Sequence, residues 1–372
     1  MYKYLPIKLT LGFLLIFGVS QAATIQVNAD APEQLEDGLC SIAEAVIAAN
    51  TDQAVDGCSA GNGADTILLE NQSYILKKAD NLTNGPNGLP AIRSEITIQG
   101  TLSNENFFEN PQAATRIERD THNAIIPPLP YTDGKPPMRL FYVMEEATLS
   151  LKNLFLSGGF TGANETFFNF EERNSLQNKG GAIFNLGTLN LQHVKLQNNH
   201  AVGSGGAIYS VGNLVIKDAR IIRNHAELFG GGAIDAQGSL MIQRTFLVQN
   251  SAELGGAIRF VSSPGQVGNK FVSVNSMIAD NRAFRGGAIY MDSGIVSRFL
   301  HTTITDNVAH TFDINVTGAS GGGLFIEGVK DNTNHQPQVM LGNTIIANNT
   351  GNDCLFETAV NLDATGNWFG DN

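Results

Sequence analysis

Short segments in which apolar and polar residues alternate make up most of the chain. Between residues 188 and 198, Leu189 and Leu191 fall on one face, and Leu214 and Ile216 repeat this pattern downstream. Runs of four to six residues with a period of two predict strands, because they are too short for a helix.

A glycine-rich motif, GGAI, recurs through the second half of the sequence. Successive copies lie 25, 26, 24, 31 and 35 residues apart. The two longer steps contain loop-like stretches, at residues 261–269 and 310–320. The motif begins at Gly180, Gly205, Gly231, Gly255 and Gly286, with a weaker copy, GGGL, at Gly321.

A second motif, Asn-x-Ala, precedes most copies of the first and shares its period. Three short strands per repeat of about 25 residues predict one coil of a right-handed parallel β-helix, an all-β solenoid. Each strand then pairs with its equivalent about 4.8 Å away in the next coil. The asparagines of this motif are Asn199, Asn224, Asn250, Asn281 and Asn307.

The chemistry of both motifs fits tight corners between strands. We expect each asparagine to adopt the left-handed conformation and to bond to its equivalent one coil above, forming a turn ladder. The paired glycines allow backbones to approach where Cβ atoms would collide, and the isoleucine of GGAI fills the interior.

One convincing helix lies near the start, at residues 41–50. Ser41 and Glu44 have the spacing of a capping box, and Ile42, Val46 and Ala49 make an apolar stripe. Because an open β-helix end exposes unpaired strand edges, we expect this helix to cap the N-terminal end.

The cysteines fit an exported protein. Cys40 and Cys58 are close enough in sequence to form a disulfide, worth about 3 kcal/mol in the chain-entropy description. Cys354 is left over and is expected to be free.

Residues 1–22 are predicted to be a signal peptide. Lys3 and Lys8 precede or flank an eleven-residue apolar run, and small residues end at Ala22. About twenty residues are needed to span a bilayer, so no membrane-spanning segment is expected in the mature chain. The protein is expected to be secreted, held at the cell surface, or periplasmic.

The mature chain is expected to form a single β-helix with an N-terminal cap. Residues 23–76 form the cap and first coils, and residues 77–372 form the β-helix. Loop insertions are expected near residues 101–137, which are proline-rich, and 160–179, which are rich in phenylalanine.

The net charge of the chain limits the classes of partner that it can bind. The chain holds 23 Lys and Arg against 35 Asp and Glu, a net charge of -12. Nucleic acid and anionic membranes are therefore poor partners, whereas neutral glycans, cations or proteins are better ones.

One outward stripe is the candidate ligand surface. The residue after each GGAI isoleucine points away from the interior, and four of these residues make up what we call the stripe: Tyr209, Asp235, Arg259 and Tyr290. In one interpretation Asp235 and Arg259 are a surface ion pair within a stacking ladder that Phe184 and Phe325 extend. In the other, the stripe binds glycans.

Catalysis has little support in the sequence. Outward acids are sparse. A carboxylate pair is conceivable at Asp292 and Glu327, but the 35-residue step leaves their register open. His200 and His225 should stack on consecutive coils, but two histidines make a weak metal site. We therefore predict no catalytic residue, no metal and no cofactor.

Residues 40–76 resemble a named module, the CSLREA domain of secreted bacterial proteins. The downstream repeats are similar to those of the polymorphic outer-membrane proteins. Ile42 and Ala43 depart from the usual Leu and Arg of the first pattern. The matching positions are Cys40, Ser41, Glu44, Ala45, Asn50, Asp56, Cys58, Ala60, Gly61, Gly63, Asp65, Thr66, Ile67 and Tyr74.

The resemblance implies export, a right-handed parallel β-helix and a link to adhesion. We expect a binding or adhesion module that recognises a polysaccharide or a host or cell-surface protein. The alternatives are a β-helix polysaccharide lyase or glycoside hydrolase, and a structural surface component.

Overall fold

The computed structural model describes most of the chain after the predicted signal peptide. The expected signal peptide and most of both predicted insertions lie outside the described residues, so they stay predictions. The described residues are 22–101, 114–121, 135–162, 175–262, 269–292, 295–310, 321–327, 336–364 and 366–370.

The largest sheet holds nineteen strands and consists of two adjacent stacks of parallel strands. Two long strands, β7 (Thr148–Ser157) and β10 (Thr188–Gln197), run through both stacks. The first stack also contains β1 (Thr24–Gln26), β2 (Asp65–Leu68), β4 (Glu95–Gln99), β13 (Asn213–Lys217), β17 (Leu240–Gln243), β20 (Lys270–Val274), β24 (Val296–Leu300), β28 (Gln338–Gly342) and β31 (Asn361–Asp363). The second contains β3 (Ser73–Leu76), β5 (Arg116–Arg119), β14 (Arg220–Ile222), β18 (Phe246–Val248), β21 (Met277–Ala279), β25 (Thr303–Thr305), β29 (Ile345–Ala347) and β32 (Trp368–Phe369).

An eight-stranded sheet and two short sheets form the other sides of the solenoid. The eight-stranded sheet contains β6 (Phe141–Val143), β9 (Ile183–Asn185), β12 (Ile208–Ser210), β16 (Ile234–Ala236), β19 (Ile258–Phe260), β23 (Ile289–Met291), β27 (Leu324–Ile326) and β30 (Cys354–Phe356). The short sheets contain β8 (Phe160–Thr161), β11 (His200–Ala201) and β15 (His225–Ala226), and β22 (Arg282–Ala283) and β26 (Val308–Ala309).

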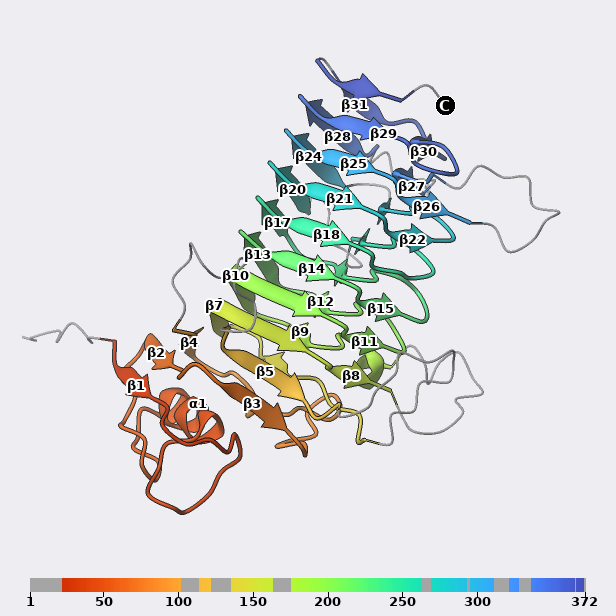
Figure 1. The fold of residues 1–372 in the computed structure, drawn as a ribbon. Helices are drawn as coiled ribbons and strands as arrows, with labels where there is room; N and C mark the ends of the chain where they lie inside the picture. Colours follow the sequence, from red (N-terminus) through yellow and green to blue (C-terminus); the bar gives the residue numbers. More distant parts are fainter. Residues whose placement is uncertain are drawn as a thin grey trace, which may run out of the picture.

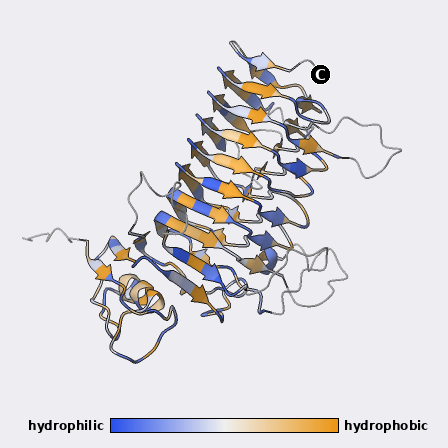
Figure 2. Cartoon of the chain, in the orientation of Figure 1, coloured by the Kyte–Doolittle hydropathy of each residue, from blue (hydrophilic) through white to orange (hydrophobic). Residues whose placement is uncertain are grey.

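The fold is a parallel β-helix, as the repeats predict. Every named strand pairing is parallel, and each strand pairs with its equivalent in the next coil, so the coils rise in one direction (Figure 1). Hydrophobic residues recur at the same places from coil to coil (Figure 2), and their side chains fill one continuous core.

The glycine pairs act at one corner of each coil. The first glycine of each pair has a positive φ, between 56° and 69° for the six copies. The second lies against the next coil, since a Cβ on Gly206 would sit 2.1 Å from the carbonyl oxygen of Gly232. A side chain at this second position is therefore excluded by backbone atoms that cannot move aside.

The Asn-x-Ala asparagines form a buried ladder along the solenoid. The side-chain amide of Asn199 donates to Asn224 Oδ1 (3.0 Å), and each later asparagine donates likewise, with Asn349 and Asp353 extending the series. Each Oδ1 also accepts the backbone N–H of the preceding ladder residue, as Asn224 Oδ1 does from Asn199 (3.0 Å).

The expected left-handed conformation of these asparagines is wrong by one residue. The residue just before each ladder asparagine carries the positive φ, as with Asn198 (55°) and Arg223 (56°). Because the left-handed residue makes the bend, the asparagine that follows it turns inward, where its amide replaces water as the partner of buried backbone groups.

Helix α1 (Ile42–Thr51) packs at the N-terminal end of the coil stack (Figure 1). Both halves of the capping box form: Glu44 N–H donates to Ser41 Oγ (3.2 Å), and Ser41 N–H donates to a Glu44 carboxylate oxygen (2.9 Å). The predicted Cys40–Cys58 disulfide is confirmed, with Cα atoms 4.6 Å apart, and Cys354 is free.

Candidate functional site

The stripe forms one column on the eight-stranded sheet. Tyr209 pairs with Asp235, Asp235 with Arg259, and Arg259 with Tyr290 in the strand register. Since the isoleucine before each of these residues lies in the core, the stripe residues face the other side of the sheet. The sequence pattern therefore places these residues correctly relative to one another.

The stripe is nevertheless buried. Tyr209 and Tyr290 are each only 3% exposed, and the rings pack against neighbours in the column. Lys179 Nζ lies 4.9 Å from the Tyr209 ring centroid, and the Gln237 side chain donates to the Tyr209 hydroxyl (2.9 Å). Burial raises the pKa of Tyr209. A sugar cannot stack on either ring in this structure.

The surface ion pair expected within the stripe is wrong. Arg259 Nη1 donates to both Asp235 carboxylate oxygens (3.2 and 3.1 Å), but the Asp235 side chain is 1% exposed and that of Arg259 is 23% exposed. Two buried rings, those of Tyr209 and Tyr290, flank the pair along the column. Its loss would leave a buried charge without its partner.

The register of the two other acids is now defined. Met291 pairs with Ile326, so Asp292 and Glu327 follow at equivalent places on adjacent coils. Glu327 hydrogen bonds to the Tyr290 hydroxyl, and burial raises the pKa of that tyrosine. Both acids thus lie beside the stripe.

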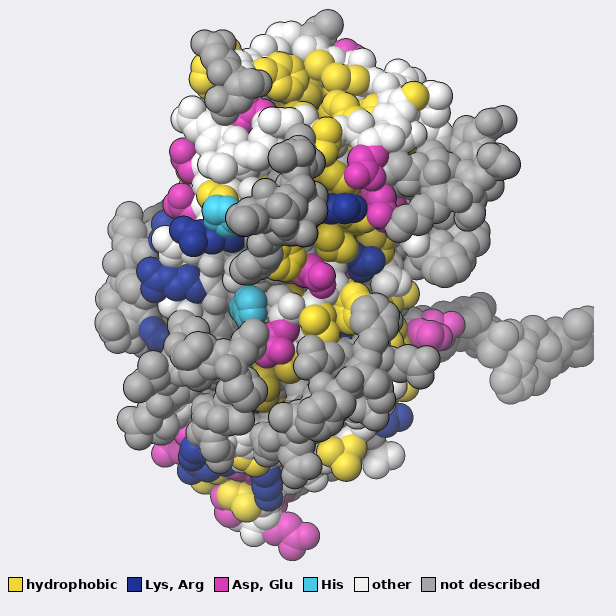
Figure 3. Space-filling view, turned by 90° about the vertical axis from the view of Figure 1, so that its right-hand side faces the viewer, with side chains coloured by type: hydrophobic (Ala, Val, Ile, Leu, Met, Phe, Trp, Pro, Cys, Tyr) yellow, Lys and Arg dark blue, Asp and Glu magenta, His cyan; other side chains and the backbone are white. Residues whose placement is uncertain are grey.

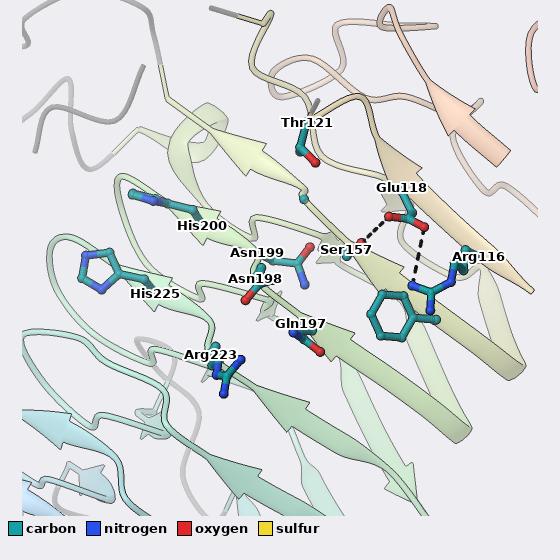
Figure 4. A pocket seen from close by; sticks show the side chains of 12 residues that line it. Arg116, Glu118, Thr121, Ser157, Gln197, Asn198, Asn199, His200, Arg223 and His225 are labelled. Carbon is teal, nitrogen blue, oxygen red and sulfur yellow. Dashed lines mark hydrogen bonds and ion pairs between the residues drawn. The ribbon is translucent and has the colours of Figure 1, made fainter. Parts of the chain in front are cut away.

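A groove lies on a different part of the solenoid, where the second stack meets the short sheets (Figure 4). Its volume is about 320 Å³. Strand β5 supplies Arg116 and Glu118, and Arg223 comes from the turn after β14. The remaining lining residues are Thr121, Phe155, Ser157, Gly158, Gln197, Asn198, Asn199, His200 and His225.

A column of three cations and one aromatic ring at equivalent outer positions begins in this groove, where Arg116 and Phe155 line it, and continues beyond its lining on the next two strands. Arg116 pairs with Phe155, Phe155 with Lys195, and Lys195 with Arg220 in the strand register. We call these four residues the cation column. The Arg116 guanidinium lies 4.2 Å from the Phe155 ring centroid and Lys195 Nζ lies 5.0 Å from it.

Like charges crowd the Lys195 amine. Its pKa is lowered, mainly by partial burial and further by the charges of Arg220, Arg116 and Arg223. The carboxylate lining the groove is that of Glu118, which lies 3.7 Å from Arg116 and accepts a hydrogen bond from Ser157 Oγ (2.9 Å). In Figure 3, Lys and Arg side chains also gather at one side of the face, beside a histidine.

The two histidines lie at equivalent positions on consecutive coils, as predicted, but their rings meet edge to face. Their ring centroids are 5.1 Å apart, and each has its own partner: His200 Nε2 lies 2.9 Å from Glu227 Oε1, and His225 Nδ1 lies 2.8 Å from Ser251 Oγ. Burial, aided by His200, lowers the pKa of His225 to about 4. Among the described residues, no three His, Cys, Asp or Glu side chains are grouped to hold a metal ion.

The groove was not predicted from the sequence, although the spacing between nearby cations and the ladder asparagines could have indicated it. Lys195 and Arg220 each lie four residues before a ladder asparagine, and Arg223 lies directly before one. Counting back from the Asn-x-Ala motif therefore aligns these cations. Arg116 and Phe155 lie in the irregular upstream coils, where no repeated motif sets the register.

Residues 194–211 match the Chlamydia polymorphic membrane protein repeat. This segment spans one Asn-x-Ala motif and one GGAI motif. No curated protein and no solved structure matches the chain. The repeat and the disulfide together fit an exported or surface protein. No helix in the described part of the chain is both long and apolar enough to cross a membrane.

Proposed function

We propose that the chain is an exported adhesion module that binds a glycan, or a protein on a cell surface, through the groove. The observation that carries this proposal is the groove itself: side-chain amides, hydroxyls and cations converge there on a rigid stack of coils. The stripe is not the surface we propose, because Tyr209 and Tyr290 are buried.

Export is part of the proposal. A signal peptide over residues 1–22 would bring the chain to an oxidising compartment, where the Cys40–Cys58 disulfide persists. We further propose that residues 40–76 act as a CSLREA-type cap, since α1 and its capping box occupy the N-terminal end of the coils. N-terminal sequencing of the exported chain tests the cleavage after Ala22.

A polysaccharide lyase or hydrolase is the second candidate, and one observation favours it. Asp292 and Glu327 occupy equivalent places on adjacent coils, as a pair of catalytic carboxylates would. Glu327, however, hydrogen bonds to Tyr290, and charge interactions couple Asp292 to Arg259. A structural surface component, the third candidate, would self-associate and bind no glycan.

One experiment separates the three candidates. The full chain is immobilised and exposed to neutral and acidic polysaccharides, with and without Ca²⁺, while the solution is assayed for new reducing ends and unsaturated uronate. We expect retention of a glycan without cleavage. Cleavage would establish the enzyme, and self-association without retention would establish the structural component.

A further inference from the structure

The cation column brings positive charges together on neighbouring strands. Lys195 and Arg220 are directly opposed on adjacent strands, and like charges in that arrangement are destabilising. Arg223 adds a third cation near them, and its side chain is exposed. A chain with a net charge of -12 has no general excess of cations, so this concentration is local.

The column also has the dimensions of an extended ligand. Arg116, Phe155, Lys195 and Arg220 occupy four consecutive strands, and strands lie about 4.7–4.9 Å apart, so the column is about 14 Å long. A linear polymer lying along the solenoid axis would meet a cation at the first, third and fourth strand. A single small anion would use only one of these positions.

The rest of the groove suits hydroxyl groups. Gln197 and Asn198 offer amides, and Thr121 offers a hydroxyl, in the groove that Arg116 also lines. Each of these groups can donate and accept hydrogen bonds, which is what the hydroxyls of a sugar require. The groove thus combines spaced positive charge with neutral polar groups.

We propose that the groove and the adjoining cation column bind an acidic polysaccharide whose sugar units carry carboxylate or sulfate groups. Arg116, Lys195 and Arg220 pair with successive anionic groups, and Arg223, on the same coil as Arg220, adds a further cation. This inference rests on the proposed function and specifies the ligand class of the same site. The polymer's charge relieves the mutual repulsion of the cations, and its hydroxyls bond to the amide and hydroxyl side chains.

The aromatic ring of the column argues against single-stranded nucleic acid. Proteins that bind single strands offer open ring faces on which bases stack. Phe155 is only 7% exposed, and the charged ends of Arg116 and Lys195 both lie over its ring. No open ring face is therefore left for a base at this position.

The test measures binding of the full chain to five polymers by isothermal titration. These are polygalacturonate, a sulfated dextran, neutral dextran, polyglutamate and a single-stranded oligonucleotide. The variants are Arg223→Gln, the double variant Lys195→Gln/Arg223→Gln, and the control Arg298→Gln, an exposed arginine on β24 of the same sheet. Far-ultraviolet circular dichroism and a melting curve establish that each variant is folded.

We expect tight binding of polygalacturonate or sulfated dextran, and little binding of the other three polymers. The double variant should weaken binding by roughly tenfold or more, while Arg298→Gln stays within about twofold. For the wild-type chain, the logarithm of affinity should fall linearly with that of salt concentration, with a slope that Arg223→Gln reduces by about one. This salt series keeps the test valid even where the double variant fails to fold.

Several results would overturn the inference. Retention of neutral dextran alone would refute the acidic ligand and leave the proposed adhesion module intact. Equal binding of polyglutamate or the oligonucleotide would show a site for any polyanion. An equal effect of Arg298→Gln would show diffuse charge attraction, and the absence of glycan binding altogether would refute both this inference and glycan recognition as the function.

Discussion

Two columns of outer residues run along the same solenoid and differ in what covers them. On the eight-stranded sheet, the stripe holds Tyr209 and Asp235, which are 3% and 0% exposed. In the second stack, the cation column holds Lys195 and Arg220, which are half-buried and lie on the two strands that follow Phe155. Strand alternation sets both columns facing away from the core, but it does not determine which of them solvent reaches.

We infer from this difference in exposure that the stripe stabilises the fold and the cation column binds the ligand. The polar groups of the stripe have partners: Asp235 pairs with Arg259, and the Tyr209 hydroxyl accepts a hydrogen bond from Gln237. In the cation column, Lys195 and Arg220 repel each other. We therefore expect substitutions in the stripe to change the free energy of unfolding, and substitutions in the cation column to change ligand affinity.

The largest effect is expected at Tyr209. Tyr209→Ala removes a buried ring that packs on Phe184 (centroids 5.0 Å apart) and leaves a cavity. The free energy of unfolding should fall by about 3–5 kcal/mol, measured by urea denaturation. Tyr209→Phe keeps the ring and serves as the control. A loss below about 1 kcal/mol for Tyr209→Ala would mean that the stripe is open to solvent.

A smaller loss is expected at Asp235. Asp235→Ala leaves Arg259 largely buried without its carboxylate, which costs about 3 kcal/mol when one partner of a buried pair is removed. The double variant Asp235→Ala/Arg259→Met should recover part of this stability, because it removes the stranded charge as well. If the double variant is less stable than Asp235→Ala, the ion pair does not account for the stability of this part of the stripe.

These two residues also show how far sequence reasoning reaches. The spacing of GGAI placed Tyr209, Asp235, Arg259 and Tyr290 in one column, and the structure has them in register. Their burial could not be predicted, because it depends on side chains that the motif does not fix, such as Lys179 directly before the first GGAI. Periodicity therefore predicts the fold, whereas exposure depends on side chains that differ from coil to coil.

A pH effect is expected from His225, which lies between the two columns. Its pKa in the folded protein is about 4, below the ordinary value of about 6.5. Only the unfolded chain takes up the proton between these values, so stability is fully present above pH 6.5 and falls as the pH drops toward 4. The loss should be at most about 3 kcal/mol, and His225→Asn should reduce it. A flat stability profile over this range for the wild-type chain would contradict the expectation.

The smallest change in stability is expected at Arg223. This side chain is exposed and contacts Gln249 (2.9 Å), so Arg223→Gln should change the free energy of unfolding by less than about 0.5 kcal/mol. Urea denaturation of this variant beside Tyr209→Ala contrasts an exposed cation next to the cation column with a buried ring of the stripe. A loss above about 2 kcal/mol would show that Arg223 has a structural role.

The most direct test compares one lysine from each column in the same sample. Lys195 belongs to the cation column, whereas Lys179 lies over Tyr209 in the stripe, and partial burial lowers the pKa of both amines. Acetylation rates of the two amines are measured by mass spectrometry with and without polygalacturonate or sulfated dextran. We predict that a bound acidic polysaccharide slows acetylation of Lys195 and leaves the acetylation rate of Lys179 unchanged. Slower acetylation of Lys179 with no change at Lys195 would contradict this prediction and would show that the ligand binds at the stripe.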